Sequence, residues 1–281
     1  MKITTILKGG LGNQMFQYAT ARALAEKFKK YNPEVCINTG FYNNPNRKYP
    51  YPLSIDNYRI SIAATHSTPY RVYKEPHYEY NDIFEKLDPK GVDMLIDGYW
   101  QCEKYFDNIR TILLQEFIPK DISQRLVGYV YKLCQHPNPY VVAVHIRRKE
   151  REEEGSARDV HGLVPWSYYE EAINKLKELV NNEPILFVIF TDDIDHAMSR
   201  YQAFPGKIIY IDPGPDYEDL YLMSKCNYAI IANSSFSWWG AWLIKNKDKI
   251  VISPDSWVKK QGIITKDVVP EKWIKLYTKL L

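Results

Sequence analysis

Two segments of the chain place glycines or small polar residues where a helix should begin. GGLGN at 9–13 follows a short apolar run. Glycines there let a ligand approach the unpaired N–H groups of the helix start, which attract anions. The glycine spacing is not that of the dinucleotide fingerprint. Taken alone, the motif is more simply a turn in which Asn13 caps the helix.

The second of these segments is ANSSFSWWGA at 232–241, which also follows an apolar run. It offers three hydroxyls, on Ser234, Ser235 and Ser237, although one such residue is enough to cap a helix. The surplus favours a second phosphate-binding site, built from hydroxyls and the N–H groups of the helix start.

A basic pair follows the apolar run at 140–146. In an extended strand, His145 and Arg147 share one face and Arg148 takes the other. Arginine there suits a diphosphate, because a guanidinium donates two parallel hydrogen bonds to phosphate oxygens. The alternative is a solvated basic strand end that pairs with the acidic stretch at 150–154.

Aspartates follow the apolar run at 185–190. Asp193 and Asp195 have the spacing of a DxD site, which holds a nucleotide diphosphate through a divalent cation. They are also typical of a helix start, where acids complement the helix dipole, and we expect at least one acid to act as a cap. A carboxylate of Asp192 or Asp193 is also suited to accept hydrogen bonds from a base such as guanine.

The elements that must position these residues alternate in type. Apolar runs predict strands at 2–7, 93–96, 140–146, 185–190, 207–211 and 228–232. Helical spacing predicts helices at 14–30, 103–117, 168–180, 193–201, 217–224 and 238–245. This alternation predicts an α/β protein with parallel sheets covered on both faces. Residues 42–89, rich in Tyr, Pro and Asn, predict loops and short elements.

The length of 281 residues allows two domains. HPNP at 136–139 interrupts the pattern and predicts a linker. We therefore expect one domain at 1–137 and a second at 138–281, with the last helix packing back on the first domain.

Composition excludes several classes of protein. The chain is 45% hydrophobic and 25% charged, which is typical of a globular domain. A net charge of +3, without a basic stripe among aromatics, argues against a nucleic-acid partner. No run approaches the roughly 20 apolar residues of a membrane span. The four cysteines are scattered and predict reduced thiols rather than a metal site. The 23 tyrosines suit sugar-binding surfaces, or reflect surface composition alone.

Five blocks together resemble the α-1,2-fucosyltransferase family, glycosyltransferase family 11. They occur in the order of the family, and the first and last are long and specific. They are GGLGNQMFQYATARALA (9–25), GYWQCEKYF (98–106), VHIRR (144–148), HGLVPWSYYEEAI (161–173) and YEDLYLMSKCNYAIIANSSFSWWGAWL (217–243).

The resemblance implies a GT-B fold, with two Rossmann-like domains that face a central cleft. It implies an N-terminal acceptor-side domain and a C-terminal domain that binds GDP-β-L-fucose. The implied reaction is transfer of L-fucose to the 2-hydroxyl of a terminal galactose in a glycan, with inversion and without a metal ion or other cofactor. The tyrosines between Tyr42 and Tyr78 are then candidates for the acceptor, and Trp238, Trp239 and Trp242 lie beside the donor.

The resemblance also assigns roles to individual residues. Arg147 stabilises the charge that gathers on the GDP leaving group. The residues expected at GDP-fucose are Gly10, Gly12, Asn13, His145, Arg147, Arg148, Asp192, Asp193, Ser234, Ser235 and Ser237. Where the family has HxRRGD, this chain has Lys149 and Glu150 after the arginines. The catalytic base is therefore open among Glu150, Asp159 and His161, or is replaced by water.

Two other functions stay open at this point. One is a metal-dependent GT-A transferase that uses Asp193 and Asp195. The other is a homologue that binds glycan or nucleotide but has lost catalysis, which the change at Lys149 and Glu150 motivates. We expect a cytoplasmic microbial or viral enzyme, with peripheral membrane contact through a lipid-linked acceptor left open. The sequence does not indicate an oligomeric state.

Overall fold

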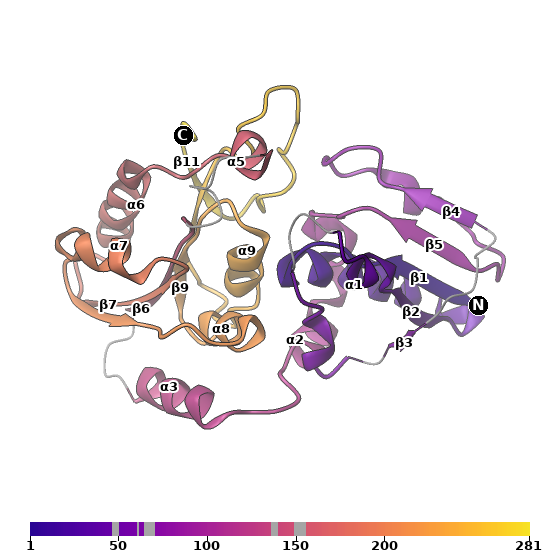
Figure 1. Cartoon of the computed structure of the whole chain (residues 1–281), viewed down its shortest axis with the longest axis horizontal. Coiled ribbons are helices and arrows are strands. Elements are labelled where there is room, and N and C mark those ends of the chain that lie inside the picture. The colour runs from indigo at the N-terminus through magenta and orange to yellow at the C-terminus, as the bar shows by residue number, and fades with distance from the viewer. Residues whose placement is uncertain (47–50, 61, 65–70, 136–139, 149–155) are drawn as a thin grey trace. The chain divides into compact units, whose positions relative to one another are not determined.

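The structure is a computed structural model that describes the chain except for residues 47–50, 61, 65–70, 136–139 and 149–155. It divides into two compact α/β units (Figure 1). Unit 1 holds residues 1–120 and 266–270, and unit 2 holds residues 121–265 and 271–281. The division therefore falls before α3 (Gln124–Cys134) rather than at 137/138. The linker predicted at 136–139 lies outside the described residues.

Unit 1 is built on a parallel sheet in the order β3-β2-β1-β5-β4. Its elements are β1 (Lys2–Ile6), α1 (Leu11–Lys27), β2 (Glu34–Asn38), β3 (Ala63–Ala64), β4 (Arg71–Lys74), β5 (Met94–Asp97) and α2 (Arg110–Glu116). The first strand and first helix confirm the prediction. The helix predicted at 103–117 is shorter, because two 3-10 turns precede α2.

Unit 2 is built on a parallel sheet in the order β11-β10-β9-β6-β7-β8. After α3 its elements are β6 (Tyr140–Ile146), α5 (Ser156–His161), α6 (Trp166–Leu179), β7 (Ile185–Thr191), α7 (Ile194–Ser199), β8 (Lys207–Tyr210), α8 (Asp216–Met223), β9 (Tyr228–Ile230), α9 (Ser235–Trp242), β10 (Val251–Pro254) and β11 (Ile274–Leu276). Counted from β6, this is the 3-2-1-4-5-6 order of a Rossmann sheet.

The two faces of this sheet are covered by different helices, α6 and α7 on one side and α8 and α9 on the other (Figure 1). The central strands are buried on both faces, so they are continuous apolar runs, as in parallel sheets generally. The fold thus confirms the predicted class of two α/β domains with parallel sheets.

The chain after Trp242 differs from the prediction. It forms β10 and β11 and, over the residues described there, no helix, so a returning last helix is wrong. An irregular segment at 266–270 joins unit 1 instead. Its Asp267 pairs with Lys104 at 2.9 Å and accepts a hydrogen bond from the Tyr80 N–H at 3.1 Å.

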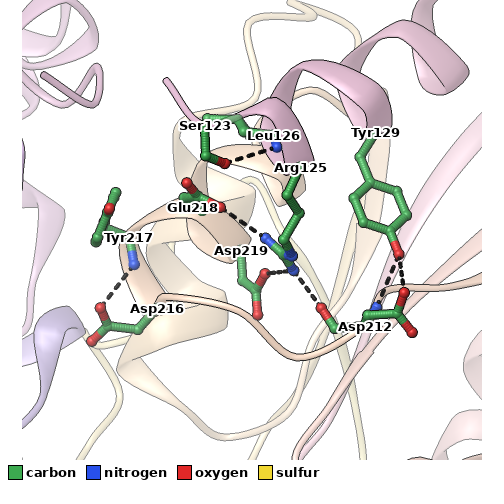
Figure 2. A network of polar contacts seen from close by, with 9 residues as sticks. All are labelled: Ser123, Arg125, Leu126, Tyr129, Asp212, Asp216, Tyr217, Glu218 and Asp219. Carbon is green, nitrogen blue, oxygen red and sulfur yellow. Dashed lines mark hydrogen bonds and ion pairs between the residues drawn. The ribbon is translucent and has the colours of Figure 1, made fainter. Parts of the chain in front are cut away.

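Arg125 explains why α3 belongs to unit 2 (Figure 2). Its guanidinium donates to Glu218 at 3.0 Å, to Asp219 at 2.5 Å and to the Asp212 carbonyl oxygen. Tyr129, one turn further along α3, donates its hydroxyl to the Asp212 carboxylate at 2.9 Å. The Glu218 side chain is only 2% exposed, so Arg125 is the cation that compensates a buried carboxylate.

Removal of Arg125 is therefore expected to destabilise unit 2 strongly. Arg125→Met leaves Glu218 buried without its cation, and we expect a loss of about 3–5 kcal/mol in the free energy of unfolding by urea. Lys175→Met is the matched control, because Lys175 and Glu178 form an exposed pair on α6, worth about 0.5 kcal/mol or less. Equal losses in the two variants would contradict a structural role for the buried pair. Adding Glu218→Gln to Arg125→Met should restore part of the loss.

Candidate active site

The strand order of unit 2 has a switch point. Strand β6 lies between β7 and β9, and the connections that follow β6 and β9 run in opposite directions along the sheet. In such sheets, ligands bind outside the carboxyl ends of the strands at this switch point. The residues that follow β6 and β9 there are the basic pair at 147–148 and the serine segment at 233–237. Two of the predicted phosphate-binding segments therefore lie at the carboxyl ends of two neighbouring strands.

Asp192 organises the basic pair. Its Oδ1 accepts a hydrogen bond from the Arg148 N–H at 2.7 Å, and its Oδ2 lies 3.3 Å from Nε of Arg147. The register places the end of β6 beside Thr191, so the two strands deliver the partners side by side. The side chains of Arg147 and Asp192 are 22% and 23% exposed. The structure thus gives Asp192 a role that the sequence prediction missed, which is to orient Arg147.

Two adjacent tyrosines of α6 donate hydrogen bonds to the backbone at the carboxyl ends of β6 and β9. The Tyr169 hydroxyl donates to the His145 carbonyl oxygen at 3.1 Å, and the Tyr168 hydroxyl donates to that of Ile231 at 2.7 Å. Burial raises the pKa of Tyr168 well above its ordinary value, which keeps it a protonated donor. The His145 ring, buried at 4% exposure, lies 5.5 Å from the ring of Phe236 in α9. The carboxyl end of β6 and the start of α9 are therefore neighbours.

The three serines do not share one environment. Ser234 is the N-cap of α9, and Ser235 is the first residue of the helix and half-buried. Ser237 is fully buried, and its hydroxyl lies 3.4 Å from the Ala232 carbonyl oxygen and 3.3 Å from that of Ser234. Ser234 and Ser235 thus lie at the helix start itself, whereas Ser237 is bonded to the backbone beneath it.

Asn233 ties this segment to the loop after β6. Its Nδ2 donates to the His161 carbonyl oxygen at 2.8 Å and to that of Trp257 at 3.1 Å. His161, a candidate base, is thereby held at the switch point, and Asp159 lies exposed on the same short helix, α5. Glu150, the third candidate, lies outside the described residues.

The remaining aspartates act as expected for a helix start. Asp193 caps α7, since its Oδ1 accepts a hydrogen bond from the His196 N–H at 3.1 Å, while Asp195 is exposed. Two parallel-sheet units also overturn the GT-A alternative, because the fold is of the GT-B class.

Unit 1 has a switch point of its own, between β1 and β5. Gly9, at φ +81°, and Gly10 turn the chain from β1 into α1, and Gly10 is the N-cap. Asn13 lies in the first helical turn and does not cap the helix, so that prediction is wrong. Instead, its Oδ1 accepts a hydrogen bond at 2.7 Å from Gln101, which follows β5. Gly12 lies in the same turn and is buried.

Gln14 and Tyr42 hold this glycine turn. The fully buried Gln14 accepts from the N–H groups of Ser54 and Ile55, both at 3.0 Å, and donates to the Gly9 carbonyl oxygen at 3.1 Å. The Tyr42 hydroxyl donates to the same carbonyl oxygen at 2.7 Å. Tyr42, a predicted acceptor residue, thus bonds the backbone of the glycine turn.

The tryptophans predicted beside the donor are core residues. Trp238, Trp239 and Trp242 are at most 2% exposed, and their rings lie 5.1–6.0 Å apart. The sequence does not distinguish the two cases, because tryptophans after a polar segment are equally typical of the buried face of a helix.

Comparison with known proteins now decides the family. Residues 1–277 match the family described as Glycosyl transferase family 11. The chain belongs to glycosyltransferase family 11. It is a glycosyltransferase, and the two-domain class of its fold agrees with this membership.

Relatives of this family 11 glycosyltransferase cover nearly all or most of the chain. It is similar to an α-1,2-colitosyltransferase of Escherichia coli, at 33% identity over 96% of this chain and 97% of the relative. A galactoside 2-α-L-fucosyltransferase, SEC1 of Bos taurus, is 24% identical over 84% of this chain and 62% of the relative.

A solved structure shares the fold. The α-1,6-fucosyltransferase NodZ from Bradyrhizobium, in a crystal soaked with GDP-fucose, superposes with a TM-score of 0.54 over 86% of this chain and 92% of that one, at 13% identity. None of the helices in the described ranges of the family 11 chain has the length and apolarity that a membrane span requires.

Three Gly→Ala variants test the glycine turn of the family 11 enzyme. A Cβ on Gly9 would lie 2.4 Å from Nδ2 of Asn13, whereas Gly262 has a similar φ of +82° and nothing within 4 Å. Gly262→Ala should cost about 1–2 kcal/mol in unfolding free energy, from backbone strain alone. Gly9→Ala should cost more, because Asn13 must also leave Gln101. Gly128→Ala, in the interior of α3, should stabilise by about 0.5–1 kcal/mol. Equal losses at Gly9 and Gly262 in urea unfolding would contradict the Asn13 contact.

Proposed function

We propose that this enzyme transfers L-fucose from GDP-β-L-fucose to the 2-hydroxyl of a terminal galactose, with inversion at the anomeric carbon and without a metal ion. The observation that carries the proposal is Arg147, oriented by Asp192 at the switch point of the sheet beside the start of α9. The name of the SEC1 relative supports the sugar, and the names of both relatives support the linkage.

The charge of the donor explains why a cation is needed. In a single in-line displacement, the acceptor oxygen forms a bond to the anomeric carbon while the bond to the β-phosphate oxygen breaks. The electron pair of that bond leaves with GDP, whose β-phosphate gains negative charge. Arg147 would stabilise this charge, and a preorganised donor of this kind is worth about 10²–10³ in rate. Asp192 supplies the preorganisation, because it limits the rotation of the guanidinium.

Other groups of the switch point suit the rest of the nucleotide. Ser234 and Ser235 offer hydroxyls, and the start of α9 offers N–H groups, to the phosphate oxygens. His145 and the Arg148 backbone are proposed near the ribose or the base. The side chain of Ser237 would support the segment rather than touch phosphate, because it is buried.

Unit 1 is proposed as the acceptor-side domain. Gly10, Gly12 and Asn13 would lie near the fucose and the β-phosphate, with the first turn of α1 as the N–H donor. The acceptor proton would pass to Glu150, Asp159 or His161, or to water. We propose the cytoplasm as the compartment, because all four cysteines are free thiols.

The decisive variant is Arg147→Ala. We expect GDP-fucose turnover with lactose as acceptor, followed as GDP release, to fall by about 10²–10³-fold. The melting temperature should stay within a few degrees, because the pair with Asp192 is partly exposed. Arg200→Ala, an exposed arginine after α7, is the matched control. Near wild-type turnover by the Arg147 variant would refute the proposal.

Metal independence is tested in the same assay. With Arg147 in the role of the cation, full turnover is expected in excess EDTA. A loss of turnover that Mg²⁺ or Mn²⁺ restores would contradict the metal-free mechanism while leaving the sugar unchanged.

A second donor sugar is favoured by one comparison, the 33% identity to a colitosyltransferase. Colitose differs from fucose by the absence of the 3-hydroxyl, so both would fit the same diphosphate site. GDP-fucose and GDP-colitose should be compared as competing donors by kcat/KM. A site that hydrogen-bonds the 3-hydroxyl would prefer fucose by a large factor, whereas preference for colitose would reassign the donor.

A further inference from the structure

A second cluster of polar and aromatic side chains lies at the switch point of unit 1, where β1 and β5 end. We call it the β5 exit cluster, and it consists of Lys8, Tyr78, Asp97, Tyr99 and Gln101. None of its members is among the residues predicted from the sequence to bind the donor or to act as base. Its members converge from three separate parts of the chain, which makes it a built site and not a local sequence feature.

The cluster combines two stacked aromatic rings with charged hydrogen-bonding groups. Nζ of Lys8 lies 2.9 Å from Oδ1 of Asp97 and 5.0 Å from the ring centre of Tyr99. The rings of Tyr78 and Tyr99 are nearly parallel, at an interplanar angle of 6° and a centroid distance of 6.4 Å. The side chains of Lys8 and Asp97 are 26% and 27% exposed, so they are accessible to a ligand.

Glu75 holds the backbone that carries Tyr99. Its carboxylate accepts hydrogen bonds from the N–H of Tyr99 at 2.6 Å and from that of Trp100 at 2.8 Å. Burial raises the pKa of Glu75, although these two hydrogen bonds act in the opposite direction. A Cβ on Gly98 would lie 2.4 Å from Cβ of Glu75, so the close approach requires glycine.

Trp100 stores strain in the same turn. It has φ +55°, a conformation that costs of order 1–3 kcal/mol in a residue other than glycine. Its ring is fully buried and packs against Phe84 and Tyr105 at 5.1 Å and 5.3 Å. With Trp100 anchored in the core and its N–H held by Glu75, the neighbouring Tyr99 remains half-buried at the surface. Strain that the surroundings maintain in this way is typical of functional sites.

We propose that the β5 exit cluster is the subsite for the terminal galactose of the acceptor. A pyranose has an apolar face of C–H groups and a rim of hydroxyls. The Tyr78 and Tyr99 rings match the face, and Lys8 and Asp97 match the rim as donor and acceptor. Gln101 connects this subsite to Asn13 in the glycine turn. The choice of galactose rests on the proposed function, but the binding of a sugar ring rests on the cluster itself.

Stability alone does not account for the charged pair. An ion pair that is about one-quarter exposed on both sides contributes roughly 0–1 kcal/mol. Lys30 and Asp88, in the same unit, form a more exposed pair at 3.3 Å with side-chain exposures of 63% and 51%. This second pair also has an aromatic neighbour, since Nζ of Lys30 lies 4.6 Å from the ring centre of Tyr31. It lies before the amino end of β2 and not at the carboxyl ends of the strands, which makes it the matched control.

The test measures acceptor and donor separately. For Asp97→Asn, Lys8→Met and Tyr99→Leu, we expect the KM for lactose to rise by about tenfold or more, the loss of one hydrogen bond to a charged group or one stacked ring. The KM for GDP-fucose and the slow hydrolysis without acceptor should stay within about twofold. Lys30→Met and Asp88→Asn should change neither KM, and nor should Tyr131→Leu, which removes an exposed ring on α3. Tyr99→Phe keeps the ring, and its lactose KM should stay near that of the wild type.

An unchanged lactose KM in the folded Asp97 and Tyr99 variants would overturn the subsite. An equal rise in both KM values would overturn it too, because the cluster would then not be specific for the acceptor. Melting temperatures establish that each variant is folded.

Binding of lactose without donor separates this proposal from the proposed function. Saturation-transfer NMR should detect lactose on the wild-type protein and not on the Tyr99→Leu variant. If GDP-fucose is not turned over but this difference persists, the fucosyltransferase proposal fails and the subsite stands. If fucose is transferred while the variants still bind lactose, the subsite fails alone. Absence of lactose binding to the wild-type protein at millimolar concentration would also overturn the subsite.

Discussion

A strand in a parallel sheet ends with backbone groups that have no further partner in the ladder, and buried polar groups seldom stay unpaired. In both units of this chain, side chains supply the partners. Gln14 bonds the Gly9 backbone after β1, Glu75 bonds the Trp100 backbone after β5, and Asp192 bonds the Arg148 backbone after β6. Asn233, which follows β9, bonds the His161 backbone at the end of α5. The geometry of the described residues at both switch points depends on these four side chains.

The consequence is that residues at the carboxyl end of each sheet are oriented by hydrogen bonds. Gln14 and Asn233 are buried, and Glu75 and Asp192 are partly exposed. Asp192 orients Arg147 through an ion pair, and Glu75 positions Tyr99 through a hydrogen bond to its N–H. Transition-state stabilisation requires groups that are oriented before the charge develops, since reorientation during the reaction would cost part of their effect. The same hydrogen bonds that satisfy the backbone thereby orient the residues proposed for catalysis and acceptor binding.

The sequence predicted what depends on local pattern. The runs at 140–146 and 185–190 are apolar and have the length of strands, and the glycine turn before α1 is recognisable from its residues. Tertiary pairing was not predictable in this way. Nothing near Arg125 indicates that its partners lie more than eighty residues later. The sequence pattern therefore predicts the boundary at the proline-rich segment 136–139 instead. Glu75 lies in an ordinary polar stretch, and no local signal connects it to Trp100.

The pairing of charges at the two switch points is also not predictable from local sequence pattern. At each switch point a cation lies beside a carboxylate, Lys8 with Asp97 in unit 1 and Arg147 with Asp192 in unit 2. Partly exposed pairs of this kind contribute little to stability, so their value lies in orientation. Arg147 and Asp192 together carry no net charge. At the proposed diphosphate site, a protein with a net charge of +3 would therefore select its ligand by hydrogen-bond geometry at an oriented cation, and not by a diffuse positive field.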